Sequence, residues 1–223
     1  MQNTLYYGDN LAILRDFSGE TVDLIYLDPP FNSSRSYNVL FKDEAGKEAD
    51  AQLTAFEDTW HWNQKAEEAY HALVTQQDEP ISRMIEAMRQ FIGSNQMMAY
   101  LVMMAARLVE LHRVLKPTGS LYLHCDPTAS HYLKVVMDTI FDVRNFRNEV
   151  IWQRTNVHSD SKTWSNVSDV ILFYSKSSQF TWNPIYAAHG EEYVADKYRY
   201  KDPNGRLYTL DNMTSPNPRP NMM

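Results

Sequence analysis

The sequence has little of several features that would each indicate a particular class of protein. Only one residue, Cys125, is a cysteine, which excludes an internal disulfide framework and a zinc site built from cysteines. No apolar run approaches the roughly 18 residues of a transmembrane helix. Residues 1–4 lack the basic and apolar segments of a signal peptide, so the simplest expectation is a cytoplasmic protein without a membrane partner.

Basic charge and glycine are scarce as well. The 21 basic residues are outnumbered by 28 acidic ones, so the overall charge gives no support to nucleic-acid binding, and any phosphate contact would have to be local. There are seven glycines, and no two of them are spaced as Gly-x-Gly. The remaining composition, with 43% hydrophobic and 22% charged residues, is that of an ordinary globular protein.

Apolar strand-like runs alternate with amphipathic helical segments along the chain. Residues 22–27 form a short, nearly continuous apolar run, which is typical of a buried parallel strand. Residues 32–60 look like a long polar loop. This alternation predicts an α/β fold with a mostly parallel sheet. The other expected strands cover residues 4–7, 120–126, 148–154 and 169–174, and the main helices cover residues 63–76, 95–115 and 128–140.

The motif that carries chemistry is Asp28-Pro29-Pro30-Phe31, which directly follows the strand over residues 22–27. In open α/β sheets, ligands bind at the carboxyl ends of the strands. The two prolines stiffen the backbone and leave its carbonyls with few local partners. A carboxylate, a rigid carbonyl and an aromatic ring together suit the exocyclic amine of a planar base. A rigid strand exit that merely turns the chain is the alternative.

Here the sequence resembles the permuted (beta-class) DNA methyltransferases of the N-4/N-6 amino-group family. The resemblance covers most of residues 4–176. It implies a partial Rossmann-like, S-adenosylmethionine-dependent methyltransferase sheet, mostly parallel with an antiparallel edge pair, in the family order 3-2-1-4-5-7-6. Residues 4–8 would be strand 3 and residues 22–27 strand 4. The segments that carry the resemblance are residues 6–11, 22–33, 113–120 and 148–152.

The resemblance also implies roles for individual residues. Asp28 and the Pro29 carbonyl would orient the target amine, Pro30 would stiffen the turn, and Phe31 would stack on a base flipped out of double-stranded DNA. An Asp at the first motif position goes more often with adenine N6 than with cytosine N4. Asp9 would lie on the side of the S-adenosyl-L-methionine cofactor, and a turn-forming role is its equal alternative.

In one respect the sequence departs from this family. The glycine-rich cofactor loop, Phe-x-Gly-x-Gly, is missing, so we expect a truncated or split enzyme whose partner is a complementing C-terminal polypeptide or a restriction subunit. Residues 1–178 would be the catalytic part and residues 179–223 the start of target recognition. The alternatives are an inactive fragment that binds DNA only and a cytosine-N4 methyltransferase.

Two further groups of residues leave alternatives open. His124, Cys125 and Asp126 could form a metal or nucleophile cluster, but without a second group of ligands we favour structural roles, with Asp126 as a possible exception facing the pocket. Thr128 is expected to cap the helix that follows. In the second region, basic and aromatic residues interleave, which suits DNA contact slightly better than an exposed hairpin around residues 202–205. The expected phosphate contacts are Lys197, Arg199, Lys201 and Arg206.

Overall fold

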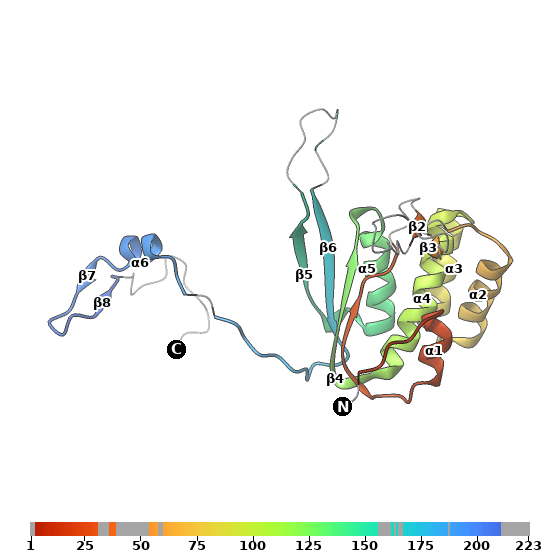
Figure 1. Cartoon of the computed structure of the whole chain (residues 1–223), viewed down its shortest axis with the longest axis horizontal. Coiled ribbons are helices and arrows are strands. Elements are labelled where there is room, and N and C mark those ends of the chain that lie inside the picture. Colours follow the sequence, from red (N-terminus) through yellow and green to blue (C-terminus); the bar gives the residue numbers. More distant parts are fainter. Residues whose placement is uncertain are drawn as a thin grey trace, which may run out of the picture. The chain divides into compact units, whose positions relative to one another are not determined.

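The chain folds as two compact units, residues 1–181 and 182–223, in the computed structural model (Figure 1). Each unit is described here by itself. The structure describes residues 3–30, 36–38, 54–57, 60–155, 162, 164, 167–186 and 188–210.

The first unit is built on a four-stranded sheet in the order β1-β4-β6-β5. Strand β1 is parallel to β4, whereas β6 is antiparallel to both β4 and β5, so three of the four strands run in one direction. This order matches the 4-5-7-6 part of the expected sheet and confirms the α/β prediction with an antiparallel pair at one edge. The strands are β1 (Val22–Leu27), β4 (Leu115–Cys125), β5 (Phe146–Gln153) and β6 (Ser168–Ser175).

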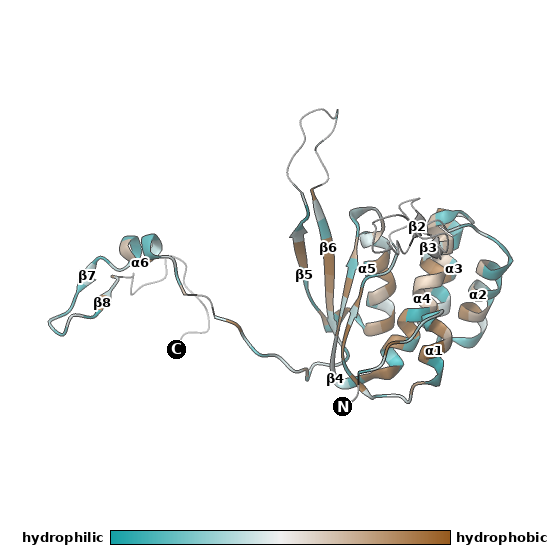
Figure 2. Ribbon diagram, viewed as in Figure 1, coloured by the Kyte–Doolittle hydropathy of each residue, from teal (hydrophilic) through white to brown (hydrophobic). Residues whose placement is uncertain are grey.

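The larger helices lie on one side of this sheet (Figure 1). The central helix, α4, contributes more of the buried core than any other described element, and side chains from α2, α3, α5 and the sheet complete it. Figure 2 shows hydrophobic residues concentrated on α4, α5 and the strands. The helices are α1 (Asn10–Asp16), α2 (Gln64–Gln76), α3 (Glu79–Ile92), α4 (Gln96–Val114) and α5 (Pro127–Phe141), followed by the 3-10 turn η1 (Val143–Asn145).

The two faces of the sheet differ in exposure because successive side chains of a strand point to opposite sides. Ile25 and Leu121 belong to the core shared with the helices. On the opposite face, Leu24 and Tyr26 of β1 are 61% and 59% exposed. Among the described residues of this unit, no helix lies on that face (Figure 1).

Several expectations about single elements were wrong. Residues 4–7 are not a strand: Leu5 is 96% exposed, and no described strand lies beside the segment to pair with its backbone. The cap of α5 is Asp126 rather than Thr128, because Pro127 occupies the first helical turn and Asp126 Oδ1 accepts from the Ala129 N–H at 3.1 Å. Helix α3 was not anticipated. Strands β2 (Ser36–Asn38) and β3 (Thr54–Glu57) pair within the expected long loop.

The second unit contains one short helix and a hairpin. Strands β7 (Tyr200–Lys201) and β8 (Leu207–Tyr208) are antiparallel, and α6 (Glu191–Lys197) precedes them. The turn is closed by a hydrogen bond of 2.9 Å from the Gly205 N–H to the Asp202 carbonyl, and Gly205 adopts a φ of +85° that favours glycine. This confirms the hairpin around residues 202–205. Across both units, no described helix has the length and hydrophobicity needed to cross a membrane.

Candidate functional site

The ends of four strands bring four polar side chains together at one end of the sheet. Asp28 directly follows β1, and His124 lies opposite it on β4, because the parallel register pairs Leu27 with Leu123. His124 Nδ1 is 3.0 Å from Asp28 Oδ1, and His124 Nε2 is 3.4 Å from Asp169 Oδ2 on β6. Arg154 Nη1, just beyond β5, is 3.2 Å from Asp169 Oδ1. These contacts form an unbroken line from Asp28 to Arg154.

Exposure to solvent falls steeply from Asp28 to Asp169, whereas Arg154 at the far end of the line is 51% exposed. The side chain of Asp28 is 60% exposed, that of His124 is 17% exposed and that of Asp169 is only 4% exposed. Asp28 is therefore accessible to a ligand, whereas His124 and Asp169 behind it are largely buried. Pro29 and Pro30 are half-buried and continue directly from Asp28, as the motif predicts. Phe31 lies outside the described residues, so its stacking role stays a prediction.

The neighbours of His124 in the sequence have structural roles, as we expected. Cys125 is fully buried in the core. Burial, together with the carboxylates of Asp126, Glu149 and Asp169, raises the pKa of its thiol to about 12, so the thiolate that a nucleophile needs is not formed near neutral pH. The Asp126 carboxylate is engaged as the cap of α5. His124 itself is the residue that sequence reasoning missed, because only the strand register places it beside Asp28.

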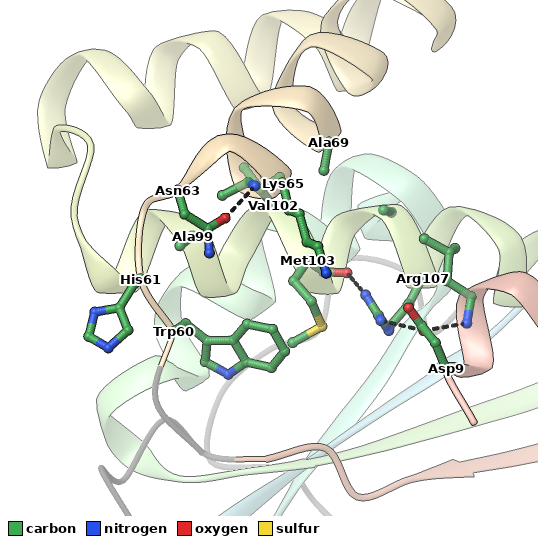
Figure 3. A pocket seen from close by; sticks show the side chains of 13 residues that line it. Asp9, Trp60, His61, Asn63, Lys65, Ala69, Ala99, Val102, Met103 and Arg107 are labelled. Atoms are coloured by element: carbon green, nitrogen blue, oxygen red, sulfur yellow. Dashed lines mark hydrogen bonds and ion pairs between the residues drawn. The ribbon is translucent and has the colours of Figure 1, made fainter. Parts of the chain in front are cut away.

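A cavity of about 540 Å³ lies between α1, α2 and α4 (Figure 3). Asp9 stands at one side of it, where its Oδ1 accepts from the Leu11 N–H at 3.0 Å and from Arg107 Nη2 at 2.6 Å. Asp9 therefore caps α1, and the structure shows the turn-forming role directly. The other lining residues include Leu11, Trp60, His61, Asn63, Lys65, Met103 and Arg107.

The guanidinium of Arg107 fixes this side of the cavity. Arg107 Nε donates to Asn10 Oδ1 at 2.7 Å, and Nη1 donates to the Met103 carbonyl at 3.1 Å. Burial lowers the pKa of Arg107, and the charge of Asp9 opposes that effect, so the guanidinium stays charged at neutral pH. The result is a preformed cavity with an oriented carboxylate and a tryptophan side chain in its lining.

Most of the predicted DNA contacts of the second unit already have partners within that unit. The Arg199 guanidinium pairs with the Asp196 carboxylate, and Arg206 Nε is 2.9 Å from Asp202 Oδ2. Lys197 Nζ donates to the Tyr193 hydroxyl at 2.8 Å. Lys201 is exposed on β7. The two aspartates offset the charges of Arg199 and Arg206, and contact of the four cations with phosphates stays a prediction.

No described group of three or more His, Cys, Asp or Glu side chains has the arrangement of a metal site.

The geometry of the strand ends defines a class: an α/β protein with an exposed acidic diproline corner at the carboxyl end of a strand in its sheet. Comparison with known proteins makes this more specific. A sequence profile of the N4/N6 DNA methylase family matches residues 22–219, and the chain belongs to this family.

Relatives within restriction-modification systems are similar over most of the chain. The Mod subunit of the type III restriction-modification enzyme StyLTI from Salmonella typhimurium is 27% identical over 88% of this chain and 27% of its own length. The type II methyltransferase M.EcaI from Enterobacter cloacae is 23% identical over 93% of this chain and 36% of its own length. The chain thus spans about a third or less of these two relatives.

The fold comparison gives a weaker likeness. The cytosine-N4-specific PvuII DNA methyltransferase is 13% identical, with a TM-score of 0.42 over 91% of this chain and 65% of that structure.

Proposed function

We propose that this chain is the amine-binding part of an S-adenosylmethionine-dependent DNA adenine N6-methyltransferase. The observation that carries the proposal is the exposed Asp28 carboxylate at the carboxyl edge of the sheet, followed by the rigid backbone of Pro29 and Pro30. Family membership supports a methyl transfer to an exocyclic amine of DNA. The preference for adenine N6 over cytosine N4 rests on the Asp at the first motif position.

The residues at this corner act mainly by accepting hydrogen bonds. The Asp28 carboxylate and the Pro29 carbonyl accept the two N–H groups of the target amine. Two acceptors favour a pyramidal nitrogen whose lone pair is localised, and a localised lone pair is the better nucleophile. Because the two acceptors are held in place before the reaction, they contribute by positioning the amine and by electrostatic stabilisation. Asp28 does not need to remove a proton beforehand; the surplus proton leaves after the methyl group has arrived.

The target base must leave the DNA duplex to reach this corner. Phe31 is placed by the sequence to stack on the flipped base. The four cations of the second unit, Lys197, Arg199, Lys201 and Arg206, are proposed to contact DNA phosphates. The names of the relatives support a restriction-modification role. A restriction subunit or a complementing polypeptide is the proposed protein partner.

The residues around the cavity beside α1 fit the nucleoside part of S-adenosylmethionine. Its volume of about 540 Å³ lies within the roughly 300–1,000 Å³ of small-molecule sites. Asp9 offers an acceptor for ribose hydroxyls or the adenine amine, and the side chain of Trp60 offers apolar surface in the same lining. When bound, the cofactor supplies the electrophilic methyl group.

Methyl transfer by the purified chain tests this proposal. We expect N6-methyladenine in treated DNA by nucleoside mass spectrometry, and we expect Asp28→Asn to lower kcat about 100-fold or more because one acceptor becomes a donor. Cofactor affinity, measured by calorimetry, should not change. Asp23→Asn is the matched control, since Asp23 is an exposed aspartate on the strand that precedes Asp28 and forms an ion pair with Lys116, away from the His124 contact.

Three outcomes would contradict the proposal in different ways. If turnover is unchanged in Asp28→Asn, the acidic diproline corner does not act in methyl transfer as proposed. Formation of N4-methylcytosine would replace the adenine assignment. DNA binding without any cofactor binding would show an inactive DNA-binding fragment.

A further inference from the structure

We propose that His124 is a positioning residue that holds the Asp28 carboxylate in the orientation needed to receive the target amine. The effect of this contact on catalysis rests on the proposed function. The contact itself, by which His124 fixes the Asp28 carboxylate, follows from the geometry alone.

The two carboxylate oxygens of Asp28 are not equivalent. Oδ1 is 3.0 Å from His124 Nδ1, a distance that fits a hydrogen bond donated by the imidazole. An exposed aspartate without such a contact would sample several rotamers at little cost. With Oδ1 engaged by the ring, Oδ2 is the oxygen left for an incoming amine. The contact therefore makes Oδ1 the oxygen that holds the carboxylate in place and Oδ2 the oxygen that accepts a hydrogen bond from the amine.

The imidazole ring is itself held from the opposite side. His124 Nε2 faces Asp169 Oδ2 at 3.4 Å, and the Asp169 side chain is almost fully buried. Arg154 Nη1 lies 3.2 Å from the other oxygen of Asp169 and supplies an opposite charge beside this buried carboxylate. A buried acid needs such a partner. The ring thus lies between two carboxylates, with Nδ1 at hydrogen-bonding distance from Asp28 and Nε2 3.4 Å from Asp169.

The strand register makes this arrangement rigid. Strand β4 pairs with both β1 and β6, so it carries His124 between the ends of the two strands that provide the carboxylates. The pairing of Cys125 with Val170 in the antiparallel register brings the start of β6 to the end of β4. A side chain at the end of a central strand moves less than one on a loop, and precise placement is what a positioning residue requires.

Imidazole NMR tests the contact without any need for turnover. In the full chain labelled with 15N-histidine, His124→Gln identifies the ring signals of His124 among the seven histidines. We expect Asp28→Asn to shift the Nδ1 signal of His124, and Asp169→Asn to shift mainly the Nε2 signal. Asp23→Asn should shift neither. If neither ring nitrogen of His124 responds to Asp28→Asn, the proposal is overturned.

Kinetics with conservative variants test the consequence. An asparagine amide can occupy the place of Nδ1 and donate to Asp28, whereas leucine cannot. We expect His124→Leu to lower kcat about 10- to 100-fold with little change in KM for DNA, and His124→Asn to recover most of that loss. His131→Asn on the exposed surface of α5 is the control and should match the wild type.

The possible failures can be told apart. If His124→Leu and His124→Asn lose activity equally, or if neither loses any, the positioning role is wrong although methyl transfer exists. If the wild type transfers no methyl group, the proposed function fails, while the NMR result still decides whether His124 holds Asp28.

Discussion

At the scale of single residues, His124 and Cys125 are adjacent in the sequence but lie in opposite environments at the end of β4. His124 points to the carboxylates of Asp28 and Asp169, whereas Cys125 points into the core. The difference follows from the alternation of side chains along a strand. A residue pair that looks like one chemical cluster in the sequence is therefore divided between a polar site and an apolar interior.

The buried thiol gives a prediction for stability at alkaline pH. The pKa of Cys125 is about 12 in the folded chain, against an ordinary value of 9.0. Because the folded state holds its proton more tightly, the contribution to stability is complete below about pH 9 and is lost as the pH rises toward 12. Urea unfolding between pH 8 and 11 should show a steeper loss of stability for the wild type than for Cys125→Ala.

Alkylation provides an independent measurement of the same thiol. We expect iodoacetamide at about pH 8.5 to modify Cys125 quickly in urea and very slowly in the folded chain, since thiolate and access are both required. Equal rates in the two states would contradict the burial of this side chain.

At the scale of elements, the junction of α4 and β4 determines how the sheet is joined to its helices. Helix α4 ends at Val114 and β4 begins at Leu115, and the register between β1 and β4 shifts before the regular pairing that starts at Ser120. Gly119 lies inside this irregular stretch. A Cβ at this position would lie 2.7 Å from Leu115 Cδ1 and 3.0 Å from the Asp23 carbonyl oxygen. Glycine is required here because strand and side chain approach so closely.

Gly119→Ala should therefore destabilise the chain. We expect a loss of about 1–3 kcal/mol in the free energy of unfolding, the usual cost of overpacking. Gly19→Ala is the matched control, because the nearest atom, the Arg113 carbonyl oxygen, would lie at an ordinary 3.5 Å. Urea denaturation followed by circular dichroism measures both, and equal stabilities of the two variants would contradict the close approach.

At the scale of the whole molecule, the first unit has an apolar sheet face that no described helix covers. Leu24 and Tyr26 are exposed on β1, and β1 is an edge strand of the described sheet. Exposed apolar side chains on an unpaired edge favour association with another chain. In the strand order that the family resemblance implies, strand 1 would pair with this edge.

We expect the chain alone to self-associate through this edge. Replacing both side chains, in Leu24→Lys with Tyr26→Lys, should shift sedimentation velocity profiles toward the monomer and lower the binding of a hydrophobic dye, because charged residues block edge pairing. Val135→Lys, which changes an exposed apolar residue on α5, serves as the control. A monomeric wild type with weak dye binding would contradict this expectation.

The sequence predicted more of the acidic diproline corner than of the chain around it. Asp28, Pro29 and Pro30 could be placed at a strand end because the run over residues 22–27 is apolar and stops at two prolines. Residues 4–7 have the composition of a strand but lack a described partner, and backbone pairing is a tertiary property that local sequence cannot supply. Helix α3 could have been found from Pro80 and the spacing of Ile81, Ile85 and Met88.

The sequence by itself determined the family, the positions of most strands and helices along the chain and the acidic diproline corner, because each can be recognised in short segments of adjacent residues. Only the tertiary structure decided which side chains meet that corner. His124, Asp169 and Arg154 come from three different strand ends, and the contacts that link them in turn to Asp28 depend on strand register. Register is set by the packing of the whole sheet on its helices, so it is not written in any single segment.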